Sequence, residues 1–284
     1  MQAWSRQFWL TSPDGGGYDA RHTKPPADLA IVAIIPARFG STRLPGKPLA
    51  DIHGKTLIER VWERTCAATL PGRVLVATDD DRIAAAVRRF GGEVVLTSSA
   101  HATGTDRLAE AARSIDADIV VNVQGDEALL DPAGIDAAVR PLLADPQLPM
   151  ATLSLPLTDL EEMLSPSVVK VVCNAAGDAL YFSRSPIPYV RAAGDLREAA
   201  AAALARGLAR RHVGLYAFRR EALLRFAALP PAPLEQAEGL EQLRALHHGM
   251  RIRVVETEGT ASVAVDTAED LERVRALVAP RPRA

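Results

Sequence analysis

The feature that most constrains the fold is a regular alternation of apolar runs and amphipathic stretches that begins at Ala30. Four pairs follow one another: AIVAIIP with LIERVWERTCAA, RVLVATD with DRIAAAVRRF, EVVLTSS with TDRLAEAARSI, and DIVVNVQGD with AGIDAAVRPLL. Apolar runs without polar alternation are typical of parallel strands that helices cover on both faces. The pattern predicts a doubly wound, three-layer α/β fold, in which ligands bind beyond the carboxyl ends of the strands.

The second half of the chain is less regular. Strands are predicted at ATLSLP, VVKVVCN, ALYFSR, HVGLYAF and RIRVVE, with an Ala-rich segment at 198–208 before the fourth of them. This order favours a small strand-rich lobe that is inserted before the chain returns to the main sheet. In the last helix, Thr267 is predicted as the N-cap, with Asp270 in a capping-box role.

Composition and the N-terminal segment narrow the range of partners. Residues 1–29 contain GGG and PP without a continuous apolar stretch, so we expect a flexible tail or the result of a misplaced start codon, not a secretory signal. A net charge of −2 with scattered basic residues argues against nucleic acid or a membrane as partner, and no run approaches the length of a membrane span. Cys66 and Cys173 lack CxxC spacing and are predicted to be buried free thiols in a reducing compartment.

The loop IIPARFGSTRLPGK after the first strand predicts a polyphosphate site. It carries three cations and two hydroxyls, namely Arg38, Ser41, Thr42, Arg43 and Lys47. Such groups at a strand end neutralise the charge of a departing phosphate, although a solvated basic loop is the alternative. The loop is not a P-loop, because five residues separate Gly40 from Gly46 and Pro48 stands where that motif has a Ser or Thr for Mg²⁺. This difference argues against an ATP-dependent kinase.

The phrase VNVQGDE places Gln124 and Asp126 just past a buried strand, with Gly125 allowing close approach of a ligand. A carboxylate that faces a phosphate loop is where Mg²⁺ would bind, and Asp266 could complete the metal site. For Asp266 the alternative is a helix cap.

Two further clusters indicate recognition of an acceptor. His212 and Tyr216 are four residues apart on a predicted strand and so point to the same face. In PLEQAEGLEQLR the polar residues recur at helical spacing opposite Leu240, Leu243 and Leu246, which by itself predicts one amphipathic helix with a solvated face. A structural histidine is the alternative for His212.

The motifs PARFGSTRLPGKPL, ATDD, HATGTDRLAE, VNVQGDE, VVKVV, LYFSRSPIPY, RHVGLYAFR, PLEQAEGLEQLR and VDTAEDLERVR, in this order over about residues 31–277, resemble the CMP-Kdo synthetase (3-deoxy-manno-octulosonate cytidylyltransferase) family. The resemblance implies a Rossmann-like nucleotidyltransferase fold of the nucleotide-diphospho-sugar transferase type, the use of CTP and Mg²⁺, a cytoplasmic location and a homodimer. It implies a single domain at 30–284, with a nucleotide-binding part at about 30–150 and an acceptor-binding and dimerisation lobe at about 151–250.

The resemblance also assigns roles to individual residues. It implies CTP binding by Arg38, Ser41, Thr42, Thr105, Asp106 and Arg107; catalysis by Arg43, Lys47 and Asp126; metal binding by Asp126 and Asp266; and acceptor binding by Gln124, Arg184, His212, Tyr216, Glu238 and Gln242. The expected reaction is attack of an acceptor hydroxyl on the α-phosphorus of CTP with loss of pyrophosphate. It needs no covalent nucleophile, and the sequence identifies no general base.

Three departures from the family pattern concern the acceptor side: Ala128 after QGDE, the turn Ser165-Pro166-Ser167, and Tyr189. Kdo is the expected acceptor, and the alternative is another keto-sugar acid or a small phosphonate such as phosphonoformate. A non-catalytic CTP-binding regulator is disfavoured, because both predicted metal carboxylates, Asp126 and Asp266, are present.

Overall fold

The computed structural model describes residues 29–40, 43–101, 103–191, 194–258 and 263–279, so the predicted tail at 1–29 lies outside the described residues except for Leu29. The first half contains β1 (Ile31–Ala37), η2 (Lys47–Leu49), β2 (Asp51–Ile52), β3 (Lys55–Thr56), α1 (Leu57–Cys66), β4 (Arg73–Thr78), α2 (Asp81–Arg89), β5 (Glu93–Leu96), α3 (Gly104–Arg113), β6 (Ile119–Asn122) and α4 (Pro132–Ala144). All four predicted strand–helix pairs are confirmed.

The second half contains β7 (Met150–Pro156), α5 (Leu160–Leu164), β8 (Lys170–Cys173), β9 (Ala179–Ser183), α6 (Leu196–Ala205), β10 (Arg210–Arg219), α7 (Arg220–Ala228), α8 (Pro233–Glu238), α9 (Gln242–His247), β11 (Ile252–Glu256) and α10 (Ala268–Val278). The five predicted strands are confirmed, and so is the helix in the Ala-rich segment. The predicted cap of α10 is confirmed too, because Asp270 N donates to Thr267 Oγ1 over 3.2 Å and Thr267 N donates to the Asp270 carboxylate over 3.0 Å.

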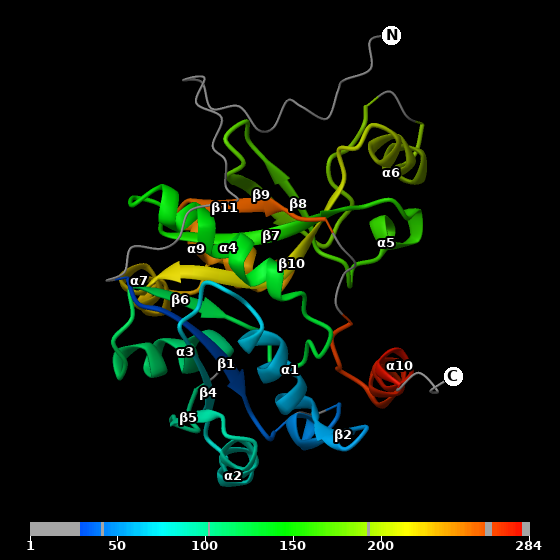
Figure 1. Ribbon diagram of the computed structural model, residues 1–284. Coiled ribbons are helices and arrows are strands. Elements are labelled where there is room, and N and C mark those ends of the chain that lie inside the picture. Colours follow the sequence, from blue (N-terminus) through cyan, green and yellow to red (C-terminus); the bar gives the residue numbers. More distant parts are fainter. Residues whose placement is uncertain (1–28, 41–42, 102, 192–193, 259–262, 280–284) are drawn as a thin grey trace.

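One nine-stranded sheet forms the centre of the molecule (Figure 1). Its main path runs β11-β7-β10-β6-β1-β4-β5, and the β8–β9 hairpin joins it through β10. The strand pairs β11–β7, β6–β1, β1–β4 and β4–β5 are parallel, whereas β10 is antiparallel to both of its neighbours, β6 and β7. The carboxyl ends of the parallel strands therefore share one edge with the amino end of β10.

Both faces of the sheet are covered by helices, which gives the predicted three layers (Figure 1). In β1, Ile31, Ala33 and Ile35 face a core shared with α1, α2, α4 and α10, whereas Val32 and Ile34 face a second core shared with α3, α7 and α9. A strand buried on both faces has no polar side, which explains why its sequence shows no alternation.

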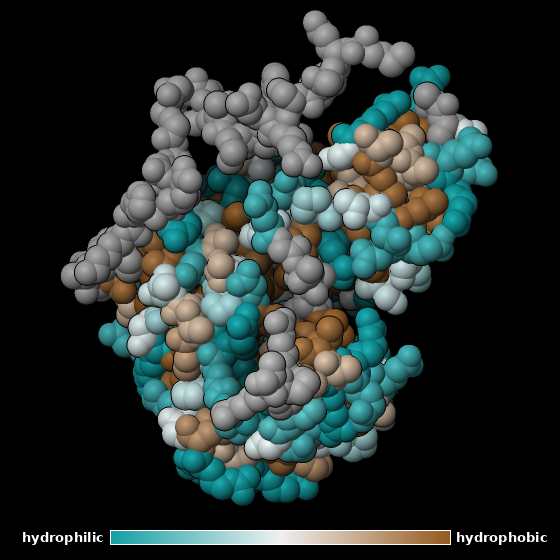
Figure 2. Space-filling model, turned by 45° about the vertical axis from the view of Figure 1, so that its right-hand side comes forward, coloured by the Kyte–Doolittle hydropathy of each residue, from teal (hydrophilic) through white to brown (hydrophobic). Residues whose placement is uncertain are grey.

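A third, smaller core lies beside the sheet, under α5 and α6. It is built from Leu157, Met163, Val190, Ala200, Ala203 and Ala209. Figure 2 shows that the surface is indented between this part of the molecule and the part that carries α10. The strands of the second half do not form a sheet of their own, because β7, β10 and β11 belong to the main sheet.

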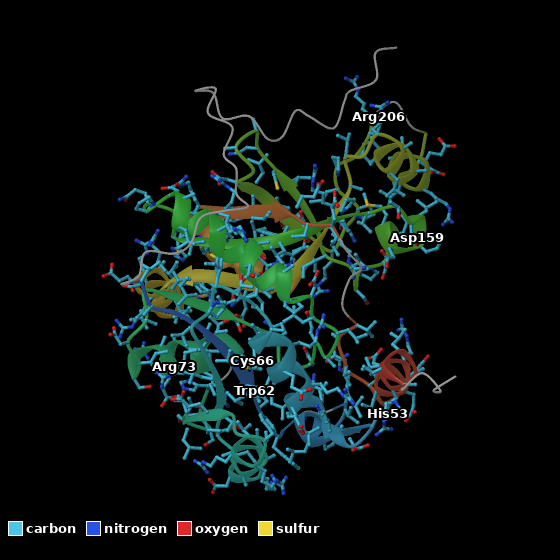
Figure 3. All side chains as sticks on the ribbon, in the orientation of Figure 1. His53, Trp62, Cys66, Arg73, Asp159 and Arg206 are labelled. Atoms are coloured by element: carbon cyan, nitrogen blue, oxygen red, sulfur yellow. The ribbon has the colours of Figure 1, made fainter. Side chains whose placement is uncertain are left out.

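Two predictions were wrong in detail. The single helix expected around 235–242 is broken into α8 and α9 at Gly239, which has φ 61°, and Glu235 and Gln242 are buried, not solvated. Neither cysteine forms a disulfide, as predicted, but Cys66 at the end of α1 is exposed and not buried (Figure 3). No helix in the described part of the chain is long and apolar enough to cross a membrane.

Candidate active site

The loop after β1 is folded around the ring of Phe39. Gly46 N donates to Phe39 O over 3.1 Å, and Lys47 N donates to Leu44 O over 3.1 Å. The guanidinium of Arg82, at the start of α2, lies 3.4 Å from the centroid of the Phe39 ring, which is a close cation–π contact. These contacts and the short turn η2 fix Lys47 at the carboxyl end of β1.

Lys47 lies between the two carboxylates that were predicted as metal ligands. Its Nζ is 2.7 Å from Asp126 Oδ2 and 3.1 Å from Asp266 Oδ1, and Arg43 Nη2 is 3.1 Å from Asp266 Oδ2. Val265 N donates to Asp126 O over 3.0 Å, which holds the segment before α10 against the end of β6. The structure thus brings together four predicted residues from three distant segments.

The geometry of these two carboxylates suits a hard cation. The Lys47 ammonium lies within hydrogen-bond distance of both Asp126 and Asp266, so a cation between them would be neutralised by both. Within the described ranges, no group of three His, Cys, Asp or Glu side chains could hold a metal. Mg²⁺ is commonly bound by one or two carboxylates together with substrate phosphates, so a carboxylate pair beside a phosphate loop fits this ion.

The QGDE segment packs tightly against the end of β1. A Cβ atom on Gly125 would lie 2.7 Å from Pro36 O, so the close approach of the two strand ends requires glycine. Burial, followed by the neighbouring Asp126 carboxylate, raises the pKa of Glu127 to about 7, with the charge of Arg211 acting in the opposite direction. The carboxylates that face the cationic loop are therefore Asp126 and Asp266, not Glu127.

The predicted CTP ligands fall into three groups. Arg38 is exposed beside the loop, whereas Ser41 and Thr42 lie outside the described residues. The three residues from GTDR, at the start of α3, are all engaged with protein atoms.

Each GTDR side chain has a clear partner. Thr105 Oγ1 donates to Glu241 Oε2 over 2.6 Å. The Asp106 carboxylate accepts bonds in the capping box of α3. Arg107 is buried, with its Nη2 3.0 Å from Asp79 Oδ2 at the end of β4. Arg107 therefore fixes the loop after β4 relative to the first turn of α3.

His212 and Tyr216 lie on one face of β10, as predicted, and their ring centroids are 5.4 Å apart. Thr152 Oγ1 is 2.8 Å from Leu215 O and 2.9 Å from His212 Nε2. Since the hydroxyl proton goes to the carbonyl, His212 must supply the proton of the second bond and carry it on Nε2. Burial lowers the pKa of His212 to about 3, so its imidazole is neutral near pH 7. Burial, with Glu241 as a smaller cause, raises the pKa of Tyr216.

Arg184 is tied to the end of α8. Its Nε donates to Glu238 O over 2.6 Å, and its Nη1 donates to Pro166 O over 2.9 Å. The Glu238 carboxylate accepts from Ser183 Oγ over 2.7 Å and from Arg184 N over 2.9 Å. Glu238 is thus held within the protein, at the end of β9.

Lys170 is a buried residue next to the predicted acceptor residue Arg184 that the sequence interpretation missed, although a lone lysine within the apolar run VVKVV was a signal. Its side chain is fully buried, and its Nζ donates to Ser165 O, Val168 O and Arg184 O over 2.9, 2.7 and 2.5 Å. Burial lowers its pKa, which the charge of Glu238 partly offsets. Lys170, Arg184 and Glu238 form a polar cluster with two cations and one carboxylate.

The remaining acceptor residues lie near this edge of the sheet. Gln124 follows β6 and approaches Gly214 of β10, and Gln242 is buried in the first turn of α9. Asn122 Oδ1 and Ser154 Oγ are buried without a hydrogen-bond partner among the described residues. Asn122 is paired with Tyr216, and Ser154 with His212. Unsatisfied buried polar atoms call for a water or a polar ligand.

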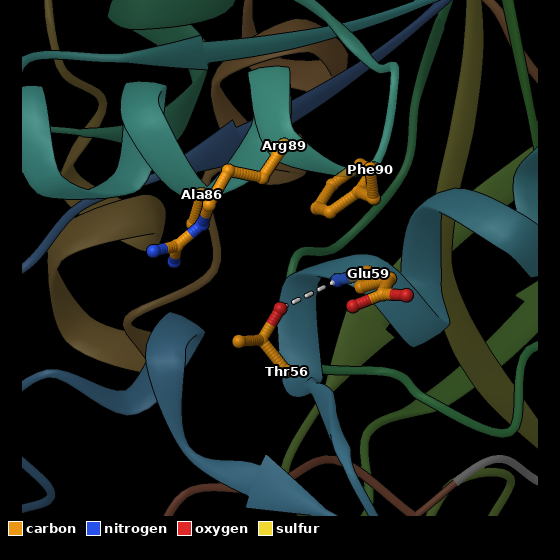
Figure 4. A pocket seen from close by; sticks show the side chains of 5 residues that line it. All are labelled: Thr56, Glu59, Ala86, Arg89 and Phe90. Atoms are coloured by element: carbon orange, nitrogen blue, oxygen red, sulfur yellow. Dashed lines mark hydrogen bonds between the residues drawn. The ribbon is translucent and has the colours of Figure 1, made fainter.

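A cavity of about 270 Å³ lies away from these residues, between α1 and α2. Thr56, Glu59, Ala86, Arg89 and Phe90 line it, as Figure 4 shows, and Thr56 Oγ1 accepts from Glu59 N over 3.3 Å as the cap of α1. None of the predicted site residues lines this cavity. The candidate active site is therefore the cluster of side chains at the carboxyl edge of the sheet.

A mostly parallel sheet whose carboxyl edge carries a cationic loop opposite two carboxylates fits a nucleotidyltransferase, and the comparisons establish the class. The family model described as "Cytidylyltransferase" matches residues 32–252. The chain belongs to the 3-deoxy-manno-octulosonate cytidylyltransferase family. Proteins of that name from Geobacter metallireducens and Geobacter sulfurreducens are 56% and 58% identical to it, over 87% of this chain and 96% and 98% of theirs.

Solved structures agree with this assignment. A CMP:2-keto-3-deoxy-manno-octonic acid synthetase complexed with CTP is 45% identical, with a TM-score of 0.80, over 88% of this chain and 98% of that one. A cytidylyltransferase from Leptospira borgpetersenii is 19% identical, with a TM-score of 0.58, over 87% of this chain and 86% of that one, and shows the fold alone. The predicted fold class and the prediction of a CTP-dependent cytidylyltransferase are confirmed.

Proposed function

We propose that the protein transfers CMP from CTP to a hydroxyl of 3-deoxy-manno-octulosonate (Kdo), which yields CMP-Kdo and pyrophosphate. The observation that carries this proposal is the position of Lys47 between Asp126 and Asp266, with Arg43 on the second carboxylate. The side chains of Arg43 and Lys47, which bind these carboxylates, can bind the phosphates of a nucleotide instead.

The chain's own residues act mainly through charge and position. Arg43 and Lys47 neutralise the negative charge that develops on the departing pyrophosphate. Mg²⁺ held by Asp126 and Asp266 would supply further charge neutralisation on the phosphates. The remaining catalytic effect comes from aligning the acceptor hydroxyl with the α-phosphorus, for which no covalent nucleophile is needed.

The polar cluster of Lys170, Arg184 and Glu238 supports an acidic acceptor. Both cations donate to main-chain carbonyls, and with only one carboxylate in the cluster they leave an excess of positive charge that favours an anion nearby. Neutral His212 and Tyr216 nearby offer hydrogen bonds without adding charge, as a polyhydroxylated acid requires.

A phosphonate acceptor is not favoured. Curated relatives that are 51% to 58% identical are named for 3-deoxy-manno-octulosonate. Two of the departures from the family pattern also have structural explanations, because Ala128 is part of the hydrophobic core and Tyr189 is 55% exposed. The third, the turn at 165–167, contributes the Pro166 carbonyl to Arg184 and so does touch the acceptor side.

Mg²⁺ as cofactor, a cytoplasmic location and a homodimer complete the proposal. The carboxylate pair supports the metal, and the homodimer follows from the resemblance to the family. The division into a nucleotide-binding part at 30–150 and an acceptor-binding and dimerisation lobe at 151–250 stays a prediction. Light scattering of the purified protein tests the dimer, and a monomeric mass would contradict it.

Pyrophosphate release tests the reaction. Purified protein is incubated with Mg²⁺, Kdo and each of the four nucleoside triphosphates, and in parallel with CTP and phosphonoformate. We expect pyrophosphate release only in the reaction that contains both CTP and Kdo. Release with phosphonoformate but not with Kdo would move the acceptor to the phosphonate class, and no release with either acceptor would contradict the enzymatic function.

A further inference from the structure

A hydrogen bond joins the nucleotide side of the site to the acceptor side. Thr105 Oγ1, in the first turn of α3, donates to Glu241 Oε2 over 2.6 Å, although the two residues are 136 positions apart. Thr105 is only 8% exposed. α3 and α9 cover the same face of the sheet, the face that carries Tyr216. The bond therefore joins two helices on one face of the sheet and is partly buried.

Glu241 is placed toward the acceptor residues. Its charge contributes to the raised pKa of Tyr216, after burial, and to the raised pKa of Arg244, after that residue's bond to Glu235. It directly precedes Gln242, the first residue of α9. By contrast, Glu238 on the other side of the Gly239 break binds Ser183 and Arg184.

The chemistry of a hydroxyl limits what Thr105 can do for a nucleotide. A threonine hydroxyl has one proton, and here that proton is donated to a carboxylate in a short, charge-assisted bond. Its remaining lone pairs repel the oxygens of a phosphate. As long as this bond persists, the hydroxyl cannot donate to CTP.

We propose that Thr105 is a positioning residue for the acceptor: it holds Glu241, and through Glu241 the first turn of α9, against the face of the sheet that carries Tyr216. This inference rests on the proposed transfer of CMP to Kdo, and it differs from the role near the nucleotide that the resemblance implies for Thr105.

The test compares Thr105→Val, which has the same shape without the hydroxyl, with Thr105→Ser, which keeps it. We expect Thr105→Val to raise the KM for Kdo about tenfold or more, the effect of losing a hydrogen bond to a charged group. The Kd for CTP, measured by calorimetry without acceptor, should stay within about twofold, and Thr105→Ser should restore the KM for Kdo. A weaker CTP affinity with an unchanged KM for Kdo would overturn the proposal.

A double-mutant cycle with Glu241→Ala tests whether Thr105 acts through Glu241. In the Glu241→Ala background, Thr105→Val should have no further effect on the KM for Kdo, and additive effects would overturn the proposal. Urea unfolding of the same four proteins reports the coupling without any substrate. If the wild type releases no pyrophosphate from CTP and Kdo, the proposed function fails. If urea unfolding shows no coupling between Thr105 and Glu241, the proposed positioning role of Thr105 is refuted.

Discussion

Asp126→Asn is the substitution that tests the candidate active site most directly, because it removes a charge and preserves shape. Asp126 is one of two carboxylates around Lys47, so the variant loses half of the negative charge available to a bound cation. We expect kcat to fall by at least about 10³-fold, which is about 4 kcal/mol of transition-state stabilisation at 1.36 kcal/mol per tenfold. Raising the Mg²⁺ concentration should recover part of the loss.

The same substitution should hardly affect the fold. The Asp126 side chain is 23% exposed, and the oxygen of an asparagine can still accept the bond from Lys47. The main-chain bond from Val265 to Asp126 O does not involve the side chain at all. We therefore expect a loss of no more than about 1 kcal/mol in the free energy of unfolding, which for a chain of this size lowers Tm by about 2 °C.

The assay is pyrophosphate release from CTP and Kdo over a series of Mg²⁺ concentrations, together with a thermal melt. Asp118→Asn is the matched control. Asp118 directly precedes β6, at the strand's other end, is exposed, and accepts from Ala30 N over 2.8 Å. The Asp118→Asn variant loses one negative charge, as Asp126→Asn does, but far from the site, and it should keep wild-type turnover. An Asp126→Asn variant with wild-type kcat would remove this residue from the metal site and refute the reasoning.

Three further predictions concern the metal, a buried ion pair and pH. In Lys47→Met, Mg²⁺ should raise Tm more than in the wild type, because the lysine ammonium no longer competes for Asp126 and Asp266. An equal or smaller rise in Tm, measured at constant ionic strength, would contradict this prediction. Glu235→Ala breaks a buried ion pair with Arg244, whose Nε donates to the Glu235 carboxylate over 2.9 Å, and should lower the free energy of unfolding by about 3 kcal/mol. Gln236→Ala changes an exposed residue of the same helix and should have little effect. Urea unfolding measures both variants. The pKa of His212 is about 3 in the folded protein and 6.5 in the unfolded chain. Between these two pH values only the unfolded chain binds the proton, so the protein loses stability as the pH falls from about 6.5 toward about 3. His212→Asn should make that loss shallower by about 1.4 kcal/mol per pH unit, and an unchanged slope between pH 6 and about 4 would show that the imidazole titrates normally.

The fold, and the meeting of Lys47, Asp126 and Asp266 in the candidate site, could be predicted from the sequence because both depend on regular features. Continuous apolar runs predicted parallel strands, and parallel neighbours end at the same edge. β1 and β6 are adjacent, so the loop with Lys47 and the segment with Asp126 had to meet. Asp266 was harder to place, and it reaches the site through the bond between Val265 and the Asp126 carbonyl.

The acceptor side was less predictable, because its side chains bind main-chain atoms. Arg184 and Lys170 donate to carbonyls of Pro166, Ser165 and Val168, and such contacts have no signature in residue types. Phe39 and Arg82 likewise meet only in the folded chain. A pattern of charges predicts where a charged group is needed, but not that a carbonyl will satisfy it.

The break at Gly239 shows that a local stop signal can outweigh helical periodicity. Apolar residues at helical spacing continue across the glycine, but Gly239 adopts φ 61° and caps α8, whose Leu240 N donates back to Glu235 O over 3.1 Å. Glycine at a helix end is a common stop signal, and here it ends the helix although the apolar periodicity continues. Because of the break, Glu238 binds Ser183 at the end of β9, whereas Glu241 binds Thr105 of α3.

The direction of β10 explains how the two halves of the site meet at one edge. In a sheet of parallel strands, His212 would lie near the start of its strand and hence at the amino edge, away from Lys47 and Asp126. Because β10 is antiparallel to β6 and β7, its amino end lies beside their carboxyl ends, with Tyr216 opposite Asn122 and His212 opposite Ser154. One reversed strand therefore places residues from the less regular half of the chain at the same edge of the sheet as the loop that carries Lys47, which the proposed transfer between two bound substrates would require.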